Sequence, residues 1–70
     1  MVFSKGVYAQ VTLKECVGRS HYFYDSRNVY DYLLKYFGHD IAASAESWTE
    51  LASVGDWYEE DGFEIEMMEE

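Results

Sequence analysis

The sequence contains no proline, a single cysteine, and no lysine or arginine after Lys35. One cysteine excludes an internal disulfide, so packing or a partner must hold the chain together, and a reducing compartment fits best. It has no run of 18 apolar residues, and its N-terminus lacks an apolar segment followed by a small-residue cleavage site. We therefore expect a cytoplasmic protein with neither a signal peptide nor a membrane span.

A length of 70 residues predicts one domain, residues 1–70, with a small core. The chain is 49% hydrophobic and 19% aromatic, which indicates a folded protein despite its net charge of −9. An acidic surface of this kind repels nucleic acids and anionic membranes. Direct binding to either is therefore not expected.

The charge is divided unevenly along the chain. Residues 1–45 contain five basic and four acidic side chains, a net charge of +1, whereas residues 46–70 contain ten acidic side chains and no lysine or arginine, a net charge of −10. Interspersed basic residues would give solubility with less self-repulsion. Their absence makes the last third of the chain the strongest functional signal in the sequence.

Two segments alternate apolar and polar residues with the period of a half-buried strand. One lies between Gly6 and Val17, and the other spans residues 63–68 after the hairpin-type turn signal Asp61-Gly62, with Phe63, Ile65 and Met67 inward and Glu64 and Glu66 outward. Residues 18–20 resemble a turn, and the aromatic run 21–24 suits a short strand antiparallel to the first. These patterns predict about three strands.

Two helices are expected between these strands. The first spans roughly 27–37, capped by Asp25 or Ser26 and ended by Gly38. The second runs from an N-cap at Ser44 to a stop at Gly55, with inward Ala45, Trp48, Leu51 and Ala52, and with Glu46 and Glu50 on a purely negative opposite face. The sequence thus predicts an α+β domain of order β-β-α-α-β, with two helices on one face of a small antiparallel sheet.

No catalytic, metal or cofactor signature is present. Only Cys16, His21 and His39 could serve as soft zinc ligands, and they lack paired spacing. A calcium loop aligned on Gly62 places Met68 where a bidentate glutamate is required. There is no nucleophile elbow or phosphate-binding loop. The abundant carboxylates are expected to be solvated, whereas acid/base catalysis needs carboxylates in different environments. We expect a protein that is not an enzyme and has no cofactor.

The acidic segment predicts a rigid charged surface, since its carboxylates fall on a helix, a turn and a strand. Outward glutamates spaced by about 6 to 7 Å are close to the spacing of phosphates along a nucleic-acid strand. Such an array can occupy a basic groove built for phosphates, with an aromatic residue as anchor. The candidate partner-binding residues are Glu46, Glu50, Asp56, Trp57, Tyr58, Glu59, Glu60, Asp61, Glu64 and Glu66.

A very short, acidic, aromatic-rich α+β domain with carboxylates at these positions resembles, in composition and style, the small phage-encoded inhibitors of host defence, the anti-CRISPR proteins and other DNA mimics. The resemblance implies a non-enzymatic inhibitor in the host cytoplasm that binds a basic nucleic-acid-binding surface of a host protein. A CRISPR-Cas effector blocked from its target DNA is the partner it implies first. The alternative is a structural or assembly module, such as a homodimer joined through the aromatic edge of the sheet, whose acidic face is only solvated surface.

Overall fold

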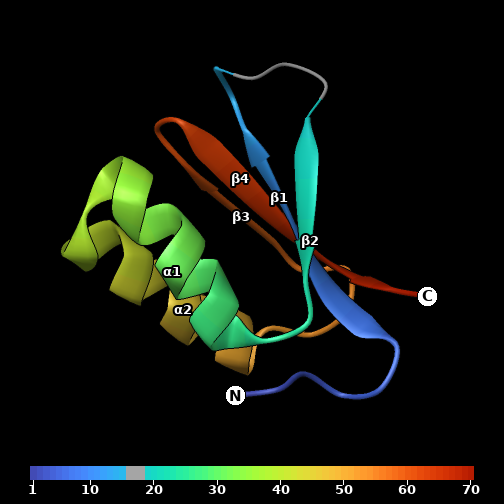
Figure 1. Ribbon diagram of the computed structural model, residues 1–70. Coiled ribbons are helices and arrows are strands. Elements are labelled where there is room, and N and C mark those ends of the chain that lie inside the picture. The colour runs from blue at the N-terminus through green and yellow to red at the C-terminus, as the bar shows by residue number, and fades with distance from the viewer. Residues whose placement is uncertain (16–18) are drawn as a thin grey trace.

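A computed structural model describes residues 1–15 and 19–70. The elements follow in the order β1 (Val7–Leu13), β2 (Ser20–Phe23), α1 (Ser26–Phe37), α2 (His39–Leu51), β3 (Trp57–Glu60) and β4 (Phe63–Glu69). The strands form one antiparallel sheet in the order β2-β1-β4-β3, and both helices lie on the same side of it (Figure 1). The predicted α+β class, with two helices on one face of the sheet, is confirmed.

The predicted number and order of strands are wrong, because the chain ends β-β and the sheet has four strands. The missed strand, β3, pairs with β4 from Trp57↔Glu66 to Glu60↔Phe63. Its sequence, Trp-Tyr-Glu-Glu, does not alternate apolar and polar residues, so periodicity does not reveal it. Pairing with β4 across the Asp61-Gly62 turn forms this strand instead.

The core lies between the helices and the two central strands, β1 and β4. These strands pair from Val7↔Glu69 to Leu13↔Phe63, which places the apolar positions of both on the helix-facing side. The predicted inward set of β4 is confirmed, because Phe63, Ile65 and Met67 are buried. The rest of the buried apolar core consists of Phe3, Ala9, Val11, Leu13, Val29, Tyr30, Leu33, Ala42 and Ala45.

Helix α1 begins and ends close to the predicted positions. Asp25 is its N-cap, and its Oδ1 accepts a hydrogen bond from the backbone N–H of Arg27 at 2.7 Å. At the other end, Gly38 has a φ of 87° and donates its N–H to the carbonyl of Leu34 at 3.1 Å. These residues therefore act as predicted.

Helix α2 begins six residues earlier than predicted, with its N-cap at Gly38 and not at Ser44. Ser44 is not its N-cap, because Gly38 alone joins the two helices and α2 starts at His39 without a side-chain cap. Its buried residues are Ala42, Ala45 and Thr49, and the hydroxyl of Thr49 donates to the Glu46 carbonyl at 2.7 Å. The predicted inward position of Leu51 is wrong, since that side chain is 87% exposed. Six helical positions after Ala45, Leu51 points about 120° away from it.

The turn at Gly62 brings the β3–β4 hairpin against the end of α1. Gly62 has a φ of 101°, and a Cβ added to it would lie 2.7 Å from Cε1 of Phe37. The ring of Phe37 in turn contacts that of Phe63, with centroids 4.9 Å apart. Glycine is therefore required here both by the backbone conformation and by the close approach of a side chain.

The N-terminal segment also packs on the domain, which the sequence patterns did not indicate. Phe3 is buried, and its N–H donates to the carbonyl of Tyr24 at 3.0 Å. Cys16, considered above as a zinc ligand, and Gly18, expected in a turn, lie outside the described residues. Within residues 1–15 and 19–70, neither helix is long and apolar enough to cross a membrane.

Candidate functional site

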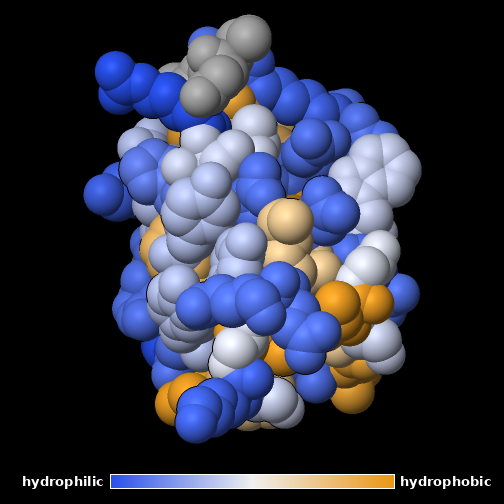
Figure 2. Space-filling model, turned by 90° about the vertical axis from the view of Figure 1, so that its right-hand side faces the viewer, coloured by the Kyte–Doolittle hydropathy of each residue, from blue (hydrophilic) through white to orange (hydrophobic). Residues whose placement is uncertain are grey.

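Within residues 1–15 and 19–70, no helix or strand packs on the side of the sheet opposite the helices (Figure 1). Because side chains alternate along each strand, the residues next to the buried ones point to this side. We call this surface the open face, and in Figure 2, which views it, hydrophilic side chains surround pale, less polar ones. It consists of Tyr8, Gln10, Thr12, Ser20, Tyr22, Trp57, Glu59, Glu64, Glu66 and Met68.

The β3–β4 half of the open face is acidic. Glu59 and Glu64 lie directly opposite each other across the two strands, an arrangement in which like charges repel. Lys14, just after β1, relieves part of this repulsion, because its Nζ lies 2.6 Å from Oε2 of Glu59. The hydrogen bond to Glu59 is the main cause that raises the pKa of Lys14 above 10.5. This row of carboxylates thus already holds one basic group in place.

Trp57 and Glu66 form the next cross-strand pair of the acidic half. Trp57 is 59% exposed and contacts no other aromatic ring within the described residues. Glu66 is exposed, and its carboxylate makes no hydrogen bond or ion pair with any residue that the structure describes. An indole ring and a carboxylate therefore stand side by side, facing solvent.

The β1–β2 half of the open face is aromatic and neutral. The ring of Tyr8 packs edge-on against that of Tyr22, with centroids 5.5 Å apart, and lies 5.8 Å from that of Tyr24 just beyond β2. The negative charge of Glu70 raises the pKa of Tyr24. Tyr22 and Tyr24 were not among the candidate site residues, although period-2 alternation along the aromatic run would have placed both on the exposed side.

Other candidate residues of the last third of the chain lie away from the open face. Tyr58 points to the helix side, where its ring lies 5.2 Å from that of Trp48 and its hydroxyl donates to Glu60 at 3.1 Å. Desolvation by burial is the main cause that raises the pKa of Tyr58. Asp56 accepts a hydrogen bond from the N–H of Ser53 at 2.8 Å, which stabilises the turn before β3. Asp61 lies in the hairpin turn.

The two helical candidates, Glu46 and Glu50, belong to the helix layer and not to the open face. Glu46 lies 3.8 Å from the guanidinium of Arg27, and Glu50 accepts a hydrogen bond from the buried hydroxyl of Ser26 at 2.9 Å. The prediction of a purely negative helix face is therefore wrong. Its error has a clear cause, because the neutralising arginine comes from α1 and cannot be found by looking for neighbours along α2.

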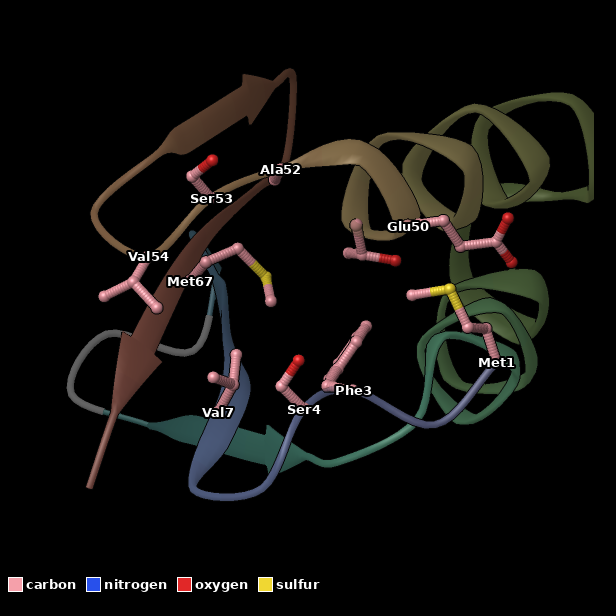
Figure 3. A pocket seen from close by; sticks show the side chains of 10 residues that line it. Met1, Phe3, Ser4, Val7, Glu50, Ala52, Ser53, Val54 and Met67 are labelled. Carbon is pink, nitrogen blue, oxygen red and sulfur yellow. The ribbon is translucent and has the colours of Figure 1, made fainter.

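A cavity of about 360 Å³ lies between the N-terminal segment, the end of α2 and β4. Phe3 and Met67 point into it, and the carboxylate of Glu50 turns toward its rim (Figure 3). Two of its polar side chains are already engaged, since the buried hydroxyl of Thr49 donates to the carbonyl of Glu46 and the carboxylate of Glu50 accepts from Ser26. Among the described residues, no three His, Cys, Asp or Glu side chains are grouped closely enough to hold a metal ion.

Comparisons with protein-family models, with curated proteins and with solved structures each found no match to this chain.

Proposed function

We propose that this protein is a non-enzymatic inhibitor that docks the open face of its sheet on a basic, nucleic-acid-binding surface of another protein and keeps nucleic acid away from it. One observation carries the proposal: no element of the described part of the chain covers one face of the sheet, and half of that face is an array of carboxylates beside an exposed tryptophan. Because strand pairing already holds the backbone of this array, only its side chains lose conformational freedom on binding. Such a surface complements clustered lysine and arginine residues.

The contacts of the candidate glutamates divide them into two groups. Glu59, Glu64 and Glu66 lie together on the open face with Trp57. Glu46 and Glu50 are engaged with α1 in the helix layer. The proposed contact surface is therefore the open face, and the two helical glutamates support the fold.

This division supplies a matched pair of variants for the test. E64Q/E66Q removes two charges from the open face, and E46Q/E50Q removes two charges from the helix layer, so both variants have the same net charge. Each is immobilised beside the wild type and exposed to a nuclease-treated lysate of the host cell at about 0.1 M and about 0.5 M salt. Screening shortens from roughly 10 Å to half that between these conditions, which weakens a charge-driven contact.

The expected result is a nucleic-acid-binding protein that the wild type and E46Q/E50Q retain at low salt, that 0.5 M salt releases, and that E64Q/E66Q fails to capture. The purified partner should then lose its nucleic-acid binding when the wild type is added. Since anti-CRISPR proteins are the class that the composition resembles, purified CRISPR-Cas effectors are the first partners to assay for loss of DNA binding. Equal capture by the two double variants would contradict the proposal, because it would show that the position of the removed charges has no effect.

Self-association is a second candidate function, and it is favoured by the edges of the sheet. The edge strand β3 contains Glu59 and Glu60, and acidic side chains of this kind discourage strand pairing between molecules. The other edge strand, β2, contains no acidic residue, and its Tyr22 is 57% exposed. A homodimer joined along β2 would keep the two acidic halves far apart. Sedimentation at about 0.5 M salt tests it, since such a dimer should persist there, and a monomer at all concentrations would exclude it.

A further inference from the structure

Resting on the proposed function, we infer that Trp57 and Glu66 form an anchor that selects arginine over lysine side chains on the basic partner. The two residues are direct cross-strand neighbours on the open face, so their Cβ atoms lie about 5 Å apart. A guanidinium is planar, so it can stack on an indole while its N–H groups bond to a carboxylate beside the ring. The ammonium of a lysine is compact, so it contacts either the indole ring or the carboxylate and not both.

The chain contains an example of this recognition within its own fold. The guanidinium carbon of Arg27 lies 4.4 Å from the ring centroid of Tyr30, while nitrogens of the same group lie 3.8 Å from Glu46 and 3.9 Å from Asp31. One arginine thus uses an aromatic face and carboxylates together. Lys35, by comparison, approaches the ring of Tyr36 only to 5.8 Å.

The two rows of the acidic half differ in what they offer a cation. In the Glu59–Glu64 row, both partners are carboxylates, and a lysine, Lys14, already occupies Glu59. The Trp57–Glu66 row pairs a carboxylate with an aromatic ring, and its carboxylate has no ion-pair partner in the described part of the chain. Of the two rows, only the Trp57–Glu66 row places an aromatic ring beside a carboxylate, which is the combination that favours a guanidinium.

The same row continues across the whole sheet. Glu66 pairs with Gln10 of β1, and Gln10 pairs with Tyr22 of β2. Three strand spacings of about 4.8 Å separate the indole at one end from the exposed tyrosine at the other. A basic segment lying across the strands therefore meets an aromatic ring at each end of the row and polar groups between them, and Glu66 supplies the carboxylate of this row.

The test compares two fluorescently labelled peptides of equal length and charge, one of alternating Arg and Gly and one of alternating Lys and Gly. Their affinities for the full-length protein are measured by fluorescence anisotropy at about 50 mM salt. We expect the arginine peptide to bind about fivefold more tightly, the advantage of one exposed cation–π contact. W57L should reduce that ratio to about one, and W57F should preserve part of it.

Y36L is the matched control, because it removes an exposed aromatic ring from the helix layer and should leave the ratio unchanged. Thermal unfolding of each variant checks that the fold survives. Equal binding of the two peptides to the wild type would overturn the arginine preference and leave the proposed function standing. Binding of neither peptide at low salt would count against the proposed charge-driven docking itself. A ratio that persists in W57L would place the arginine site elsewhere and overturn the anchor.

Discussion

Replacing Gly62 by alanine should destabilise the protein clearly more than the same change at Gly55. Both glycines have a positive φ, 101° and 94°, so each alanine pays a similar backbone cost of about 1–2 kcal/mol. A new methyl group at residue 55 would have no heavy atom within 4 Å, whereas at residue 62 it would lie 2.7 Å from the ring of Phe37. Relieving that overlap costs about 1–3 kcal/mol more.

The free energy of unfolding should therefore fall by about 1–2 kcal/mol in G55A and by about 2–5 kcal/mol in G62A. The loss of freedom in the unfolded chain is the same for both changes and cancels in the comparison. For a 70-residue domain, whose total stability is roughly 4–10 kcal/mol, the larger loss leaves a measurable unfolded population. Urea titration followed by tryptophan fluorescence gives both values.

A second substitution tests whether Phe37 causes the difference. F37L alone should be destabilising, because its ring packs on that of Phe63. In the G62A background the same change removes the overlapping atoms, so it should cost less or restore stability, giving a non-additive cycle. Equal midpoints for G55A and G62A, or simple additivity with F37L, would refute the reasoning.

Two further outcomes follow from single contacts. D25A should lower the free energy of unfolding by about 1 kcal/mol, because the Asp25 carboxylate caps α1 by accepting from the N–H of Arg27. Urea titration measures this loss. A loss no greater than that caused by D31A, at an exposed position of the same helix, would contradict the prediction. E59Q should lower the pKa of Lys14 toward 10.5, which NMR titration of the side chain would detect. In the wild type the raised pKa means that this pair stabilises the fold fully below pH 10.5 and that its contribution is lost above it, so an unchanged lysine pKa in the variant would rule out Glu59 as the cause.

Period-2 alternation was enough to predict the two central strands, because their inner and outer faces meet different surroundings. Phe63, Ile65 and Met67 are buried, and the glutamates between them face solvent. Edge strand β3 follows no such rule. Its Trp57 is exposed and its Glu60 points toward the helix side, so a residue's position in the sheet outweighs its polarity. The turn signal at Asp61-Gly62 implies a strand before it, so β3 could have been predicted from this signal and not from its own residue pattern.

The sequence pointed to the acidic residues of the candidate surface, but it did not show which of them lie together. The absence of lysine and arginine after residue 35 is what draws attention to the last third of the chain. Which carboxylates are free depends on contacts between distant segments, such as Arg27 with Glu46, Ser26 with Glu50, and Lys14 with Glu59. No spacing rule along one element contains that information, because only the fold brings these partners together.

The pairing of β1 with β4 has a consequence for how the chain reaches its native state. Val11 pairs with Ile65, so the two middle strands of the sheet come from opposite ends of the sequence. Closing a loop of about 50 residues costs roughly 3–4 kcal/mol of chain entropy before the strand contacts form and offset it. The α1–α2 pair, joined by one residue, has no such delay. A growing polypeptide can thus fold its helices early, whereas its sheet gains its central partner only when residues 63–69 have been synthesised, so long-range closure should limit the rate of folding.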